Sequence, residues 1–282
     1  MTVYSGRYGS VGGQTQVLNW NIESMMSDNA HANSATRAGK QRDEGVHDWT
    51  GTVNVDGPIQ VSSLFLPFTF TGNTGAPTIT GNGLRLTGNA MWTSIAISGD
   101  ITNGSRVTVN ASFGGHGPLL HNQESSASSD VANTIIMSKD CTVTWNGEEI
   151  DWQQFNFTIT NEVQTYVGSS TVIDGFVWTQ RYPGLVDCSG SVTLKGSEVL
   201  ATQGDLATLE IKKGSYIIFK ITYARYLSTS GIGANPNTGE LVGYTGNFGM
   251  CAHSEPGALE NATLGSITLF GNIIWPESAS AT

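Results

Sequence analysis

One ten-residue segment occurs twice in this chain and constrains its fold more than any other feature. Residues 48–57 read Asp-Trp-Thr-Gly-Thr-Val-Asn-Val-Asp-Gly, and residues 187–196 read Asp-Cys-Ser-Gly-Ser-Val-Thr-Leu-Lys-Gly. The second segment begins almost half of the chain length after the first. Side chains alternate in both as a half-buried strand requires, and a glycine follows where a turn is expected. The repetition indicates an internal duplication.

Two further matches have the same order along the chain. Leu18, Trp20 and Ile22 alternate with asparagines, and Phe155, Phe157 and Ile159 repeat that alternation at nearly the same spacing. Residues 107–114 match residues 242–249, again at nearly the same spacing. Three ordered blocks predict two tandem copies of one domain, each of ordinary domain size. Chance matches within a Thr- and Gly-rich chain are the alternative. We expect a first domain at 1–120, a linker at 121–134 and a second domain at 135–282.

The composition favours strands and turns over helices. Charged residues make up only 13% of the chain, and 35 residues are glycine. Thr, Ser, Asn and Val are abundant, which is typical of a mainly-β protein with at most a short helix. The net charge of −10 argues against nucleic-acid binding, because phosphates are bound by Lys and Arg. An acidic surface could instead repel nucleic acid from a passage that it lines.

The three cysteines indicate neither a disulfide framework nor a zinc site. Cys141, Cys188 and Cys251 are odd in number, far apart and outside CxxC spacing. The first residues contain no apolar run typical of a secretory signal, and no stretch approaches the roughly 18 apolar residues of a membrane helix. We therefore expect folding in a reducing compartment and no membrane partner.

Two long segments between strands are the candidate contact surfaces. Residues 24–47 are polar and mixed in charge, so they form either a mobile surface loop or an extension that becomes ordered on a neighbouring molecule. Residues 161–187 are apolar and aromatic, so we expect them to contact another chain or the other copy. The candidate contact residues are Asn29, His31, Arg37, Lys40, Arg42, Asp43, Glu44, Tyr166, Phe176, Trp178 and Tyr182.

Local signals place several turns. Asn103-Gly104 and Asn146-Gly147 are dipeptides typical of two-residue hairpin turns. Residues 114–133 are rich in Gly, Ser and Asn and read as the connection between the copies. Residues 204–212 are compatible with a short helix.

The sequence contains no convincing constellation for catalysis or for cofactor binding. The five histidines form no HExxH motif, and no nucleotide-binding glycine loop is present. Glu148, Glu149 and Asp151 cluster after a turn, where a solvated hairpin tip is a simpler interpretation than a glycosidase pair. The tryptophans suit core packing, with a sugar-binding platform as the alternative. We expect no cofactor, no metal and no enzymatic activity.

An amphipathic strand, a long polar hairpin loop and the strand Asp48-Trp49-Thr50-Gly51-Thr52-Val53 together resemble the tail tube proteins of long-tailed bacteriophages. The later strand ending Phe113-Gly114-Gly115 is similar to the closing strand of that fold. Cys188 replaces the tryptophan in the second copy. The resemblance covers both halves of the chain.

The resemblance implies a β-sandwich with a short helix in each copy. Six such domains form a ring whose inner strands close into one β-barrel, so a chain with two copies would form a trimer. Rings would stack through the long loop and the terminal arm, with viral DNA passing through the lumen without specific binding. Partners would be the chain itself and other tail proteins, in a virion assembled in the bacterial cytoplasm. The alternatives are a tail hub or distal tail protein of the same duplicated fold, a glycan-binding adhesin, and an enzyme.

Overall fold

A computed structural model describes residues 10–11, 17–31, 41–57, 66–73, 83–124, 135–196, 200–250, 268–269 and 273–274. The fold is mainly β, as predicted, and the described helices are two three-residue 3-10 turns, Ser138–Asp140 and Ser169–Thr171. The strands of the first half are β1 (Ser10–Val11), β2 (Val17–His31), β3 (Gln41–Asp56), β4 (Phe68–Asn73), β5 (Gly83–Asp100) and β6 (Thr108–Glu124). The strands of the second half are β7 (Thr142–Trp145), β8 (Glu148–Ile150), β9 (Trp152–Asn161), β10 (Gln164–Tyr166), β11 (Val172–Ile173), β12 (Phe176–Trp178), β13 (Gln180–Tyr182), β14 (Val186–Leu194), β15 (Leu206–Lys213), β16 (Tyr216–Ala234), β17 (Leu241–Met250), β18 (Thr268–Leu269) and β19 (Ile273–Ile274).

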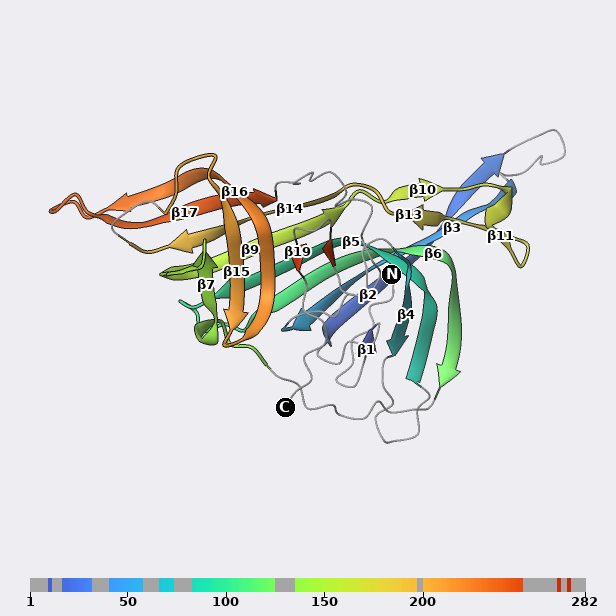
Figure 1. Cartoon of the computed structure of the whole chain (residues 1–282). Coiled ribbons are helices and arrows are strands. Elements are labelled where there is room, and N and C mark those ends of the chain that lie inside the picture. The colour runs from blue at the N-terminus through green and yellow to red at the C-terminus, as the bar shows by residue number, and fades with distance from the viewer. Residues whose placement is uncertain are drawn as a thin grey trace.

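Eight long antiparallel strands form one continuous sheet across the molecule (Figure 1). The pairings run β2–β3–β6–β5 through the first half and β9–β14–β17–β16 through the second. We call these four-strand sets the first unit and the second unit. They are joined edge to edge, because β5 pairs directly with β9.

The two units have the same strand order and the same register. Gly51 of β3 lies between Ile22 of β2 and Phe113 of β6. Gly190, its counterpart in the repeated segment, lies in the same way between Phe157 of β9 and Phe248 of β17. Glycine is required at both places, since a Cβ would lie 2.6 Å from the Phe113 ring at Gly51 and 2.4 Å from the Phe157 ring at Gly190.

Irregularities of the ladder also recur at equivalent positions. The β5–β6 register shifts between Trp92 and Ser94, and the β16–β17 register shifts between Tyr226 and Ser228. The hairpin turn after each strand contains a glycine with a positive φ, Gly104 at +60° and Gly239 at +72°. A hairpin thus lies where Asn103-Gly104 predicts one, but its turn spans four residues, 101–104, and not two. The two-residue turn predicted at Asn146-Gly147 is confirmed, since φ is positive at both residues and Trp145 lies opposite Glu148. Shared bulges and turns are hard to reconcile with chance similarity, because they are specific local features and not consequences of composition.

The structure corrects four details of the sequence interpretation. Residues 24–31 and 41–47, whose polar character predicts a long loop, instead continue strands β2 and β3. In the first block Trp20 and Ile22, and not Leu18 and Trp20, take the places of Phe155 and Phe157. Strand β6 continues to Glu124, so residues 114–124 are strand and the expected linker at 121–134 begins inside it. Residues 206–213 form strand β15 and not a helix, because they pair with both β7 and β16. The domain boundaries themselves stay a prediction.

Each unit covers the apolar face of the long sheet with a second layer (Figure 1). In the first half, β4 and the first part of β5 bend away from the sheet, and Phe68 stacks on Trp92 with centroids 4.2 Å apart. In the second half, β7, β15 and the first part of β16 form the layer. The ring centroids of Phe219 and Phe157 lie 5.0 Å apart. Burial of these aromatic rings is the main stabilising contribution in each half.

The units differ most at Trp49, whose place in the second unit is taken by Cys188. Trp49 is fully buried, and its indole N–H donates to the Gly117 carbonyl at 2.9 Å. A Cβ on Gly115 would lie 2.2 Å from that indole nitrogen. The equivalent pair in the second unit is the buried Cys188 with Met250, so a smaller residue on one strand accompanies a larger one on its neighbour. Core volume is thereby conserved between the units although the residues are not.

Candidate subunit interface

The seam between the units is an antiparallel ladder between β5 and β9. It runs from Ser94 opposite Thr160 to Asp100 opposite Gln154. The Ile101 N–H donates to the Gln153 carbonyl at 2.9 Å, and the Gln154 amide donates to the Asp100 carboxylate at 2.9 Å. One unit thus binds the next by pairing its last strand with the first strand of its neighbour.

Within the described part of the chain, both outer ends of this pair of units carry the same strand edges without a partner. On β16, the edge that corresponds to the seam is occupied by β15 as far as Tyr226, whose N–H donates to the Asp205 carbonyl at 2.8 Å. Beyond Tyr226, β16 pairs only with β17 among the described residues. At the other end, β3 is the sole strand paired with β2 in the described part of the chain. An unpaired edge of this length exposes a row of backbone donors and acceptors that favours addition of another strand.

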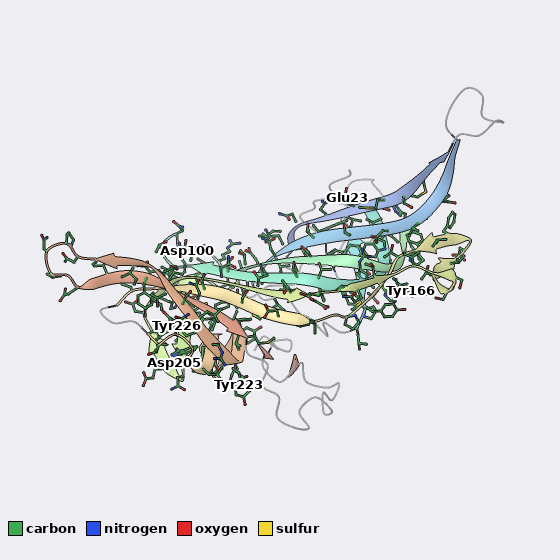
Figure 2. All side chains as sticks on the ribbon, turned by 90° about the horizontal axis from the view of Figure 1, so that it is seen from above. Glu23, Asp100, Tyr166, Asp205, Tyr223 and Tyr226 are labelled. Carbon is green, nitrogen blue, oxygen red and sulfur yellow. The ribbon has the colours of Figure 1, made fainter. Side chains whose placement is uncertain are left out.

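The face of the long sheet opposite the core is polar and carries few charges. We call it the polar face; Figure 2 looks onto it, with Glu23 and Asp100 at well-separated places. Its cross-strand rows are Asn21, Thr52, Ser112, Ser94, Thr160 and Asp187; Asn19, Asn54, Asn110, Ala96, Thr158 and Ser189; Asp56, Thr108, Ser98, Asn156, Ser191, Asn247 and Ser228; and Asp100, Gln154, Thr193, Thr245 and Ser230. These rows consist mostly of hydroxyls, amides and carboxylates. The second row continues through Gly249 to Arg225 on β16, and Arg106 forms an ion pair with Asp56 of the third row. The polar face therefore offers few cationic side chains to a phosphate, and Arg106 is already paired with a carboxylate.

Asp100 ends the seam and holds the adjacent turn. The Thr102 hydroxyl and the Asn103 amide each donate to its carboxylate at 2.6 Å. These bonds stabilise the ionised form, and the Thr102 hydroxyl contributes most to lowering the pKa of Asp100 below its ordinary value. In the second unit Asn235 takes this place, and its side-chain oxygen accepts the Asn237 N–H at 2.9 Å.

Residues 162–185 fold back from the second unit onto the first. β12 pairs in parallel with β3, and the Trp178 ring lies 4.9 Å from the His47 ring. Arg181 of β13 forms a two-pronged ion pair with Asp48, in which Nη1 and Nη2 each lie 2.7 Å from one carboxylate oxygen. The same guanidinium donates to the Gly115 carbonyl and is buried, with 8% of its side chain exposed. We call this arrangement of Arg181, Asp48 and Gly115 the clamp.

The structure brings some of the predicted contact residues together and separates others. Phe176 and Trp178 both lie against His47, which Glu44 contacts at 3.0 Å between Oε1 and Nε2. Tyr166 and Tyr182 remain exposed, with their rings 6.5 Å apart. The backbones of Asn29, His31, Arg42 and Asp43 lie in the β2–β3 ladder, whereas Arg37 and Lys40 lie outside the described residues.

The comparisons with known proteins do not assign a family. A scan against models of protein families finds no match. A search of curated proteins finds no matching relative.

Sequence reasoning missed the clamp, although a signal for it exists. Gln180-Arg181 repeats Gln41-Arg42 at the same spacing that separates Asp187 from Asp48. The match is short and its flanking residues differ in character, so composition hides it. The strand pairing shows that the two arginines are equivalent. Arg42 lies opposite Ala30, and Arg181 lies opposite Thr165. Thr165 is the counterpart of Ala30 when Trp20 is aligned with Phe155.

The described residues contain little else that suggests a chemical site. They hold no cluster of three or more metal-ligating side chains and no helix long and apolar enough to cross a membrane. Every tryptophan in the described ranges is buried or half-buried, which removes the surface needed for a sugar platform. Burial raises the pKa of Cys141 to about 11 and raises that of Cys188 further, so both thiols stay protonated and weakly nucleophilic near neutral pH. Glu148 and Glu149 are exposed, as expected for a hairpin tip.

Proposed function

We propose that this chain is a structural virion protein, the tail tube protein of a long-tailed bacteriophage, whose molecules join edge to edge into trimeric rings. The observation that carries the proposal is the β5–β9 seam. It is a unit-to-unit contact inside one chain, and the same two edges are unpaired at the outer ends of the chain's two units, within the part of the chain that is described. Repeating the seam between molecules places β16 of one chain against β2 of the next, in the same antiparallel sense.

Repetition of the seam closes into a ring if each unit turns by the same angle. Six units, as the family resemblance implies, would give a barrel of about 24 strands with a backbone radius of about 24 Å at a tilt of about 40°. Second layers cover the apolar face of each unit, which leaves the polar face to line the lumen. Because cationic side chains are few on this face and Arg106 is paired with Asp56, DNA would pass mostly along hydroxyls, amides and carboxylates without being held. In this role the protein has no enzymatic activity.

Negative-stain microscopy of the purified protein tests the proposal. We expect annuli with a central hole, stacked into tubes as protein concentration rises. Isolated elongated monomers at high concentration would contradict it. Annuli that never stack would favour a tail hub or distal tail protein, which needs the ring but not the tube.

A further inference from the structure

The clamp has a second, unfilled counterpart on the other unit. Asp187 occupies the place of Asp48, and its Oδ1 accepts the N–H of the following residue at 2.8 Å, as Asp48 Oδ1 does. Thr160 lies opposite Asp187 in the ladder, just as Met25 lies opposite Asp48. Asp187 is exposed, and no ion pair involves it in the part of the chain that the structure describes.

The space that receives the guanidinium is also repeated. Arg181 fits over Gly114, where a Cβ would lie 2.3 Å from its Nε. Gly249 stands at the equivalent place in the second unit, where the three atoms nearest to a Cβ all belong to the Leu227 side chain, the first at 3.1 Å. The second unit therefore repeats the carboxylate and the glycine of the clamp, with the exposed Leu227 side chain over the glycine in place of an arginine.

No second hairpin of the same molecule can fill this site, because residues 162–185 are already docked on the first unit. The equivalent hairpin belongs to the first unit, and Arg42 stands in it at the place of Arg181. Across the proposed head-to-tail seam, the first unit that neighbours Asp187 is that of the next molecule. We propose that Arg42 of a second copy of this chain binds Asp187 and that this bidentate pair locks the contact between chains. The inference rests on the proposed ring.

Docking requires the β2–β3 hairpin to bend as the second-unit hairpin does. In the second unit the ladder is interrupted between β9 and β10 on one strand and between β13 and β14 on the other. Gly184 lies in the second interruption, where a Cβ would lie 1.6 Å from the Glu162 carbonyl oxygen. The first unit has Gly45 at the equivalent place, and a Cβ there would lie 2.2 Å from the Ser27 carbonyl oxygen. The β2–β3 register shifts next to it, between Met26 and Asp28. Both hairpins thus have a glycine where they must bend.

Single and paired substitutions in the full-length protein test the inference. We expect Asp187→Asn and Arg42→Gln each to lower the association constant between chains at least about tenfold, measured by sedimentation. The charge exchange Arg42→Asp with Asp187→Arg restores association, because it rebuilds the pair in reverse. Glu149→Gln, which neutralises another exposed carboxylate, leaves association unchanged. Melting of the Asp187→Asn monomer matches the wild type, since Asp187 is exposed.

The outcomes separate this inference from the proposed function. If the wild type forms rings and Asp187→Asn forms them equally well, the pair is absent and the ring proposal stands. Weakened single variants that the charge exchange fails to rescue would also overturn the pairing. If the wild type does not associate at all, the ring and the pair are both wrong.

Discussion

We expect replacement of Thr229 with proline to abolish the proposed ring formation and to leave the folded monomer intact. Across the internal seam the Ile101 N–H donates to β9, and backbone groups alternate in an antiparallel ladder, so the N–H of Ile95 also points to β9. Thr229 is the counterpart of Ile95, because their partners Gly246 and Ala111 hold the same place in the matching blocks of β17 and β6. The Thr229 N–H therefore points to the free edge of β16. Proline removes that donor and places its ring where the next strand would approach.

Thr229→Ala is the matched control. Both substitutions remove the 2.7 Å hydrogen bond between the Tyr226 and Thr229 hydroxyls, so the variants differ only in the effects of the proline ring, which removes the backbone donor and blocks the edge. We expect the free energy of unfolding of the proline variant to stay within about 1 kcal/mol of the alanine variant, since the ladder to β17 is untouched. Sedimentation velocity and microscopy measure assembly. A proline variant that forms rings as readily as the alanine variant would place the subunit contact elsewhere.

Replacing Trp49 with alanine produces the largest loss of stability that we expect from a single core substitution. The side chain is fully buried, and its ring lies 5.6 Å from Phe70 and 6.2 Å from Phe113. Truncation leaves a cavity and an unpaired Gly117 carbonyl, and buried Trp→Ala changes cost about 3–5 kcal/mol. Equilibrium unfolding in urea, followed by circular dichroism, measures the change.

Cys188→Ala is the comparison, because Cys188 holds the same place in the second unit and is also fully buried. This substitution removes only the sulfur atom, so we expect the free energy of unfolding to fall by about 1 kcal/mol. The contrast tests whether Trp49 anchors the first unit in a way that the second unit does not share. Equal losses for the two variants would mean that position, and not side-chain volume, determines the cost.

Much of the repeat could be predicted from the sequence, and its one error has a physical reason. The blocks that begin at residues 48 and 107 are aligned as the structure aligns them, because a required glycine and a large aromatic residue mark their register. The block at Leu18 is instead displaced by one full alternation of the strand. Strand side chains alternate with a period of two, so such a displacement leaves the apolar pattern unchanged. The correct alignment follows only from the pairing of β2 with β3 and of β9 with β14. That pairing makes the buried Trp20, and not the exposed Leu18, the counterpart of Phe155.

The clamp and the free edges could not be derived from sequence patterns. Arg181 and Asp48 lie in different halves of the chain, and their contact depends on a hairpin that bends back over the neighbouring unit. An edge is a property of the assembled sheet, since β5 and β16 have similar patterns and yet only β5 has a following unit to pair with.

Disulfide trapping between β16 of one molecule and β2 of the next tests the repeated seam most directly. Ser94 lies opposite Thr160 in the internal seam, and their counterparts are Ser228 and Met25. Directly opposed strand residues are about 4.5–5.5 Å apart between Cα atoms, which suits a disulfide. A chain carrying Met25→Cys, Ser228→Cys and Cys251→Ser should, after mild oxidation, give a non-reducing gel ladder that ends at a covalent trimer. Chains that stay monomeric while rings form, or a ladder that continues past three, would contradict the account.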